Sequence, residues 1–141
     1  MTVPAGYSGT PLARKLGVKE GNRLLLAHAP AGFAVPDLPP GVAAHRRPGA
    51  APYDVILLFA TERAGLHARF RRAADRLTPA GGLWVCWPKR TAPPALRLPS
   101  DLDENTVRDV GLAAGLVDNK VAAVDPTWSG LRFVVRLRDR A

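Results

Sequence analysis

The sequence predicts an α/β fold with a mostly parallel sheet that ends in a C-terminal antiparallel hairpin. Two continuous apolar runs, at 22–28 and 53–60, are typical of strands that are covered on both faces. The apolar spacing changes to a helical one at 62–77, and residues 131–138 alternate strictly, as a strand with two unlike faces does. Strands that alternate with helices usually build a parallel sheet, which is the basis of the prediction.

A short helix is expected between residues 11 and 17, before the first strand. Ser8 or Thr10 can cap its start, and Pro11 suits its first turn. Gly17 supplies the stop.

The segment between the first two apolar strands is expected to be irregular. Residues 29–41 hold four prolines. Proline breaks a helix, so this stretch allows at most one short helical turn, around 33–38. A weak edge strand is expected at 42–46, followed by a turn at 48–52.

The middle of the chain predicts a strand, a helix and a further strand. Phe70 belongs to the apolar face of the helix at 62–77. Thr78 and Pro79 are expected to end this helix, and the glycine-containing stretch 80–82 to turn the chain into a strand at 83–87.

The C-terminal third predicts a capped helix and the hairpin. The helix spans 103–114, with Asp101 or Asp103 as its cap. A strand follows from Leu116 or Val117 to Val124.

The turn of the hairpin is expected at 125–130, before the alternating strand. Arg132, Arg136 and Arg138 share one face of that strand. A sheet covered on both faces would not bury three arginines, so one face is expected to be open to water or a partner.

Length and composition favour one ordinary globular domain, residues 1–141. No apolar run approaches the roughly 20 residues that cross a bilayer, and the N-terminus lacks the pattern of a secretory signal, so a cytoplasmic location is expected. Cys86 is the only cysteine, which excludes an internal disulfide. The three histidines have no metal-binding spacing, and no metal site is expected.

The net charge of +8 raises the question of an anionic partner. Arg69, Arg72 and Arg76 form a stripe on the predicted helix that could meet a phosphate backbone. No helix-turn-helix, zinc finger or aromatic sheet motif accompanies it, so a generally basic, solvated surface explains the same residues.

The second half of the chain resembles class I S-adenosylmethionine-dependent methyltransferases, through LTPAGGLWV at 77–85 and AAGLV at 113–117. The whole chain resembles more closely a family of small bacterial proteins described as a domain of unknown function. That resemblance rests on GYSGTPLARKLG at 6–17, LWVCWPKR at 83–90 and VDPTWSGLRFV at 124–134. It implies a truncated, methyltransferase-like Rossmann sheet and no assigned reaction.

Two motifs of true methyltransferases are missing. Their first strand leads into a glycine-rich turn that admits the cofactor, whereas this chain has HAPAGF at 28–33. The acidic residue that would hold the ribose hydroxyls after the second strand is replaced by AAHRRP at 43–48. S-adenosylmethionine stays a candidate cofactor on the resemblance alone.

Ligands of open α/β sheets bind where the carboxyl ends of parallel strands meet, and this edge is the candidate site. Lys89 and Arg90 could bind a phosphate or carboxylate there. Trp87 and Trp128 could stack on a ring, although core packing is the common role of tryptophan. The predicted binding residues are Tyr7, Ser8, Thr10, His28, Trp87, Lys89, Arg90, Trp128 and Ser129.

Each polar member of this set also has a structural explanation. Tyr7, Ser8 and Thr10 could hold an anion at a helix start or simply cap the helix. Ser129 has no neighbouring base and no nucleophile-elbow pattern, so we assign no catalytic residue.

Three functions are therefore compatible with the sequence. The first is a non-catalytic binding module for a small anionic or nucleotide-like ligand. The second is a divergent S-adenosylmethionine-dependent methyltransferase. The third is a basic accessory protein of nucleic acids. The oligomeric state is left open.

Overall fold

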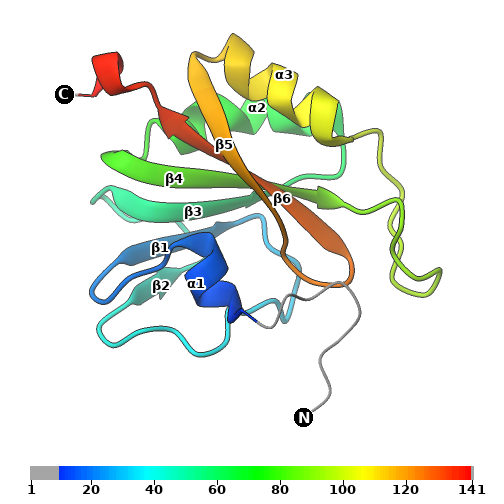
Figure 1. Cartoon of the computed structure of the whole chain (residues 1–141), viewed down its shortest axis with the longest axis horizontal. Coiled ribbons are helices and arrows are strands. Elements are labelled where there is room, and N and C mark those ends of the chain that lie inside the picture. Colours follow the sequence, from blue (N-terminus) through cyan, green and yellow to red (C-terminus); the bar gives the residue numbers. More distant parts are fainter. Residues whose placement is uncertain (1–9, 141) are drawn as a thin grey trace.

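The computed structural model describes residues 10–140 of the chain. It is an α/β fold built on a six-stranded sheet with the strand order β2-β1-β3-β4-β6-β5 (Figure 1). In chain order the elements are α1 (Leu12–Leu16), β1 (Arg23–Ala27), β2 (Ala43–His45), β3 (Tyr53–Phe59), α2 (Arg63–Ala74), β4 (Leu77–Pro88), α3 (Glu104–Ala113), β5 (Leu116–Ala123), β6 (Trp128–Val135) and a 3₁₀ turn (Leu137–Asp139).

The first four strands run in one direction. β1 pairs in parallel with both β2 and β3, and β3 pairs in parallel with β4. β6 lies antiparallel between β4 and β5. The predicted fold class is confirmed, a truncated methyltransferase-like Rossmann sheet with an antiparallel C-terminal pair.

Each face of the sheet has its own core. Helices α2 and α3 lie together on one face, where Leu66, Phe70 and Val107 pack against side chains of the sheet (Figure 1). On the other face, Leu16 of α1 and Val35 of the irregular segment pack against a second buried cluster. The apolar runs in β1 and β3 are continuous because alternate residues enter these two cores.

The prediction for residues 75–82 was wrong. Helix α2 ends at Ala74, and β4 already begins at Leu77, so Thr78 and the following glycines belong to the strand. The N–H of Tyr53 donates to the carbonyl of Arg76, 2.8 Å away, and draws the chain into the sheet directly after the helix. A register shift between Tyr53 and Val55 absorbs the additional residues of β4.

The final hairpin also differs from the prediction. β6 begins at Trp128 rather than Leu131, because the Asp125 carboxylate accepts N–H groups from Thr127 and Trp128, both at 2.8 Å, and tightens the turn. β6 ends at Val135, so only Arg132 of the three predicted arginines lies within the strand.

Two aspartates hold the starts of the helices on the two-helix face, and the outer strands of the sheet are short or irregular. Asp103 is the N-cap of α3 and accepts the N–H of Thr106 at 2.8 Å, while Asp101 accepts the N–H of Arg63 at 2.7 Å. The outer strands are the three-residue β2 and β5, whose pairing with β6 shifts between Asp118 and Lys120. No helix within residues 10–140 is long and apolar enough to cross a membrane.

Candidate functional site

The carboxyl ends of the parallel strands meet at one edge of the sheet, as predicted. Lys89 follows β4 there, and its N–H donates to the carbonyl of Thr127 at 2.8 Å. Trp87 pairs with Ser129 on the neighbouring β6. His28 follows β1, two strands away from β4 in the sheet order.

The two tryptophans at this edge are part of the core. Trp87 and Trp128 are each 6% exposed and belong to the clusters on opposite faces of the sheet. The ring of Trp128 packs edge-on against Phe59, with centroids 5.0 Å apart. Neither ring offers an open face, and their part in ligand binding stays a prediction.

The other predicted residues have varied surroundings. Arg90 is exposed and lies 3.6 Å from the carboxylate of Asp103. The pKa of that carboxyl is lowered, chiefly by the hydrogen bonds from Thr106 and further by Arg90. Thr10 precedes Pro11, which occupies the N-cap position of α1. Tyr7 and Ser8 lie outside the described residues.

A cavity of about 460 Å³, which we call the arginine pocket, opens beside the end of β1. Its apolar lining includes Leu25 and Ala27 of β1, Leu58 of β3 and Ala73 of α2. Its polar lining consists of His28 and five arginines, Arg46, Arg47, Arg69, Arg72 and Arg76. The volume lies within the range of small-molecule sites.

Two sequence features build the arginine pocket. Arg69 and Arg72 of the predicted stripe lie on α2, where positions three apart share a helix face, and Arg76 follows just after the end of the helix. Arg46 and Arg47 directly follow β2, and sequence reasoning missed them as site residues. The signal that could have identified Arg46 and Arg47 is a pair of basic residues directly after a strand, the same pattern that identified Lys89 and Arg90 as candidates.

The arginine pocket concentrates positive charge. Among residues 10–140, no carboxylate forms an ion pair with any of the five arginines. Arg46 donates to the carbonyls of Pro30 and Phe33, which fixes its guanidinium beside the irregular segment. Unpaired guanidinium groups around an apolar floor favour an anionic ligand with a nonpolar part.

His28 contributes an unusual backbone and a neutral ring to the arginine pocket. Its φ angle is 57°, in the left-handed region that costs a side-chain-bearing residue about 1 kcal/mol. Burial, and secondly the nearby charge of Arg69, lower the pKa of the imidazole. The ring is therefore neutral at pH 7 and can both donate and accept a hydrogen bond.

The described residues offer neither a reactive thiol nor a cluster of metal ligands. Cys86 is fully buried, and burial raises the pKa of its thiol, so it is not a nucleophile at neutral pH. No group of three His, Cys, Asp or Glu side chains within residues 10–140 could hold a metal ion.

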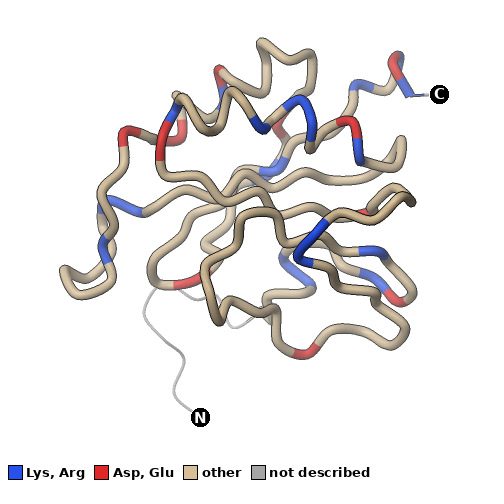
Figure 2. The backbone as a smooth tube through the Cα atoms, turned by 180° about the vertical axis from the view of Figure 1, so that it is seen from behind, with Lys and Arg blue, Asp and Glu red and all other residues tan. Residues whose placement is uncertain are grey.

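Basic residues are not confined to the arginine pocket. Figure 2 shows Lys and Arg at positions in several separate segments of the backbone rather than along one continuous run. A phosphate backbone is usually followed by a continuous basic surface, so this layout gives no support to a nucleic-acid interface.

Solved structures similar to this chain include S-adenosylmethionine-dependent methyltransferases. One from Aquifex aeolicus has a TM-score of 0.56 and 16% identity, with 86% of each chain covered. The 1,6-didemethyltoxoflavin-N1-methyltransferase of Burkholderia thailandensis, solved with S-adenosylhomocysteine, has a TM-score of 0.56 and 15% identity over 86% of this chain and 73% of that one. An O-methyltransferase from neocarzinostatin biosynthesis has a TM-score of 0.59 and 13% identity over 93% of this chain and 52% of that one.

At such identities the likeness shows the fold and leaves activity to the site. No family model and no curated protein matches the sequence. The kinship with the small bacterial family therefore stays a prediction.

Proposed function

We propose that this protein binds a small anionic, nucleotide-like ligand in the arginine pocket and does so without catalysing a reaction on it. The observation that carries the proposal is the set of five arginines around an apolar floor, with no ion-pairing carboxylate among the described residues. The pocket also lies at the strand-end edge where α/β sheets bind ligands.

The parts of a nucleotide match the parts of this pocket. Guanidinium groups bind phosphate through two parallel hydrogen bonds, and Arg47, Arg69 and Arg72 supply such groups from two elements. Leu25 and Leu58 provide a surface for a planar ring. The neutral imidazole of His28 can hydrogen-bond to a hydroxyl or ring nitrogen.

Calorimetry with ADP, adenosine and pyrophosphate tests this proposal. We expect ADP to bind most tightly, because it alone uses both the arginines and the apolar floor. The variants Arg47→Glu and Arg72→Glu should each bind ADP at least about tenfold more weakly, because each loses one charge-assisted hydrogen bond. Arg63→Glu, on the same helix as Arg72 but outside the pocket, is the matched control. Equal affinity in all variants would refute the proposal.

A divergent methyltransferase is the second candidate, favoured by the solved structures of the same fold. The arginine pocket argues against it, since the sulfonium of S-adenosylmethionine is itself positive. Titration with S-adenosylmethionine and S-adenosylhomocysteine separates the two functions. Saturable micromolar binding of either compound would favour the methyltransferase, and its absence would remove that candidate.

A further inference from the structure

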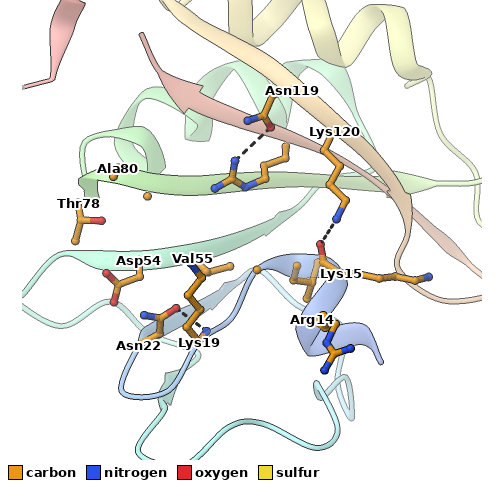
Figure 3. Close-up of a pocket in the computed structure, with 14 residues that line it drawn as sticks. Arg14, Lys15, Lys19, Asn22, Asp54, Val55, Thr78, Ala80, Asn119 and Lys120 are labelled. Atoms are coloured by element: carbon orange, nitrogen blue, oxygen red, sulfur yellow. Dashed lines mark hydrogen bonds between the residues drawn. The ribbon is translucent and has the colours of Figure 1, made fainter. Parts of the chain in front are cut away.

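A second basic cavity lies at the opposite edge of the sheet, where the parallel strands begin. This amino-edge hollow has a volume of about 400 Å³ (Figure 3). The residues on which the inference rests are Lys19, Asn22, Asp54, Asn119, Lys120 and Arg132, all of which line it. Its position beside the start of β3 separates it from the arginine pocket, which lies beside the end of β1.

The wall of the hollow is fixed by hydrogen bonds that join α1 to the sheet. The indole N–H of Trp84 donates to the carbonyl of Leu16 at 3.0 Å, in the buried interior. The ammonium of Lys120 donates to the carbonyl of Lys15 at 2.9 Å, and the ammonium of Lys15 donates to Ala123 at 3.2 Å. These bonds connect one short helix to both β4 and β5, so the cavity is preformed.

Two glycines in β4, Gly81 and Gly82, shape the floor of the amino-edge hollow. A Cβ on Gly82 would lie 2.4 Å from Nε of Arg132, so glycine leaves the space that the guanidinium occupies across the strand. A Cβ on Gly81 would lie 2.9 Å from Oγ1 of Thr78 and 3.0 Å from the carbonyl of Asp54. Gly81 and Gly82 have the composition of a turn in the sequence, but in the structure they are strand residues. The absent side chain of Gly82 makes room for the Arg132 guanidinium on the sheet.

Cationic side chains gather on one side of the hollow. Burial, and secondly Arg140, lower the pKa of Arg132, whose Nη1 donates to the amide oxygen of Asn119 at 3.3 Å. Burial, then the charges of Lys89 and Lys120, lower the pKa of Lys15. Among the described residues, no carboxylate forms an ion pair with Lys19, Lys120 or Arg132.

The opposite side of the hollow carries oxygen acceptors. Figure 3 shows Asp54 and Asn22 on one side and Asn119 and Lys120 on the other. Oδ2 of Asp54 accepts the N–H of Arg23 at 2.8 Å, which holds the carboxylate in place and leaves its second oxygen available to a hydroxyl. Asn22 is held in the same way, because its Oδ1 accepts the N–H of Lys19 at 2.8 Å.

We propose that the amino-edge hollow is a second binding site, for a phosphorylated sugar. The phosphate binds Lys120 and Arg132, and the sugar hydroxyls hydrogen-bond to Asp54 and Asn22. A cationic side for the phosphate and a carboxylate with an amide for the hydroxyls are the complementary groups that such a ligand needs. The site is independent of the function proposed for the arginine pocket.

NMR titration of the ¹⁵N-labelled protein with ribose 5-phosphate, orthophosphate and ribose tests this proposal. We expect ribose 5-phosphate to shift the amide signals of Lys19, Gly81 and Lys120 in a saturable way and to bind more tightly than either fragment. Shifts confined to residues around His28, or none that saturate, would overturn the proposal.

Three variants identify the contacts. Arg132→Gln should weaken binding of ribose 5-phosphate at least about tenfold. Asp54→Asn should reduce the advantage of ribose 5-phosphate over orthophosphate. Lys19→Glu guards against a folding effect, because the Lys19 side chain is exposed and the described hydrogen bonds of this residue are made by its backbone N–H and carbonyl, both with Asn22. It too should weaken binding, and unchanged affinity in Lys19→Glu and Arg132→Gln would overturn the proposal.

Arg47→Glu, in the arginine pocket, is the reciprocal control. It should weaken ADP binding and leave the shifts at Gly81 and Lys120 unchanged. If it abolishes binding of ribose 5-phosphate, that ligand occupies the arginine pocket and the proposed second site is wrong. Failure of ADP to bind would refute only the function proposed for the arginine pocket.

Discussion

The two faces of the sheet are covered in different ways. One face is covered by α2 and α3, helices of 12 and 10 residues whose apolar side chains repeat at helical spacing. The other is covered by α1, with five residues, and by irregular chain that includes Val35. Both cover a buried core, so regular secondary structure is not a requirement for closing this sheet.

The difference lies in what holds each cover in place. On the two-helix face the contacts are mainly apolar, and Phe70 packs edge-on against Phe133 with centroids 5.3 Å apart. A partly buried ion pair at 2.9 Å, between Arg108 of α3 and Asp118 of β5, adds to them. On the α1 face, the hydrogen bond from Trp84 to Leu16 and the two lysine bonds supplement a small apolar contact. We infer that a short cover needs directed polar bonds because it buries too little to be held by packing alone.

Truncation of the core on the two-helix face should have the largest effect. Phe133→Ala removes a fully buried ring that packs against Phe70 and fills the space left by the missing Cβ of Gly111. We expect a loss of about 3–5 kcal/mol in the free energy of unfolding, measured by denaturant titration. A loss below that of the Trp84 variant described below would reverse the comparison of the two faces.

Overpacking the same contact should have a smaller effect. A Cβ on Gly111 would lie 2.0 Å from Cε1 of Phe133, so Gly111→Ala forces the helix or the ring to move. We expect Gly111→Ala to lose about 1–3 kcal/mol of unfolding free energy. Gly49→Ala, where the nearest atom to the new Cβ would be Nη2 of Arg23 at an ordinary contact distance of 3.4 Å, is the control and should be close to neutral.

Removal of the indole donor tests the α1 face. Trp84→Phe leaves the buried carbonyl of Leu16 without its partner, and we expect a loss of about 1–2 kcal/mol. Hydrogen exchange should show the main increase in α1. Trp87→Phe, on the other face, changes the same residue type without removing a described indole hydrogen bond and should leave exchange in α1 unchanged. Uniformly faster exchange in Trp84→Phe would contradict a locally held cover.

The cap of α3 should have the smallest effect, and one that depends on pH. The lowered pKa of Asp103 means that its stabilising contribution is present above the ordinary carboxyl pKa of about 4 and is lost as the pH falls through the folded-state value. Asp103→Asn keeps a capping acceptor but should remove this part of the acid-dependent decrease in melting temperature. An unchanged pH profile would show that the cap does not depend on charge.

The parts of the fold that depend on local sequence patterns were predicted correctly. The apolar runs of β1 and β3 and the helical spacing around Phe70 identified the parallel sheet and α2. The start of β4 was missed because Thr78 to Gly82 have the composition of a turn, whereas their strand pairing depends on Tyr53, which is distant in sequence.

The candidate site was predicted only in part for a similar reason. The edge of the sheet and His28 followed from strand direction, and the arginine stripe followed from helix periodicity. Which basic residues share a cavity depends on how α2 sits over the end of β1. That packing brings Arg47 to the stripe and leaves Arg90 beside Asp103.

The form of the two outer strands also affects behaviour in concentrated solution. β2 offers only three residues for pairing, and β5 has an irregular register with Lys120 at the irregularity. Short, irregular or lysine-bearing margins are poor templates for the addition of a strand from another molecule. We therefore expect the folded chain to resist growth into fibrils, even though its interior strands are among the most apolar segments of the sequence.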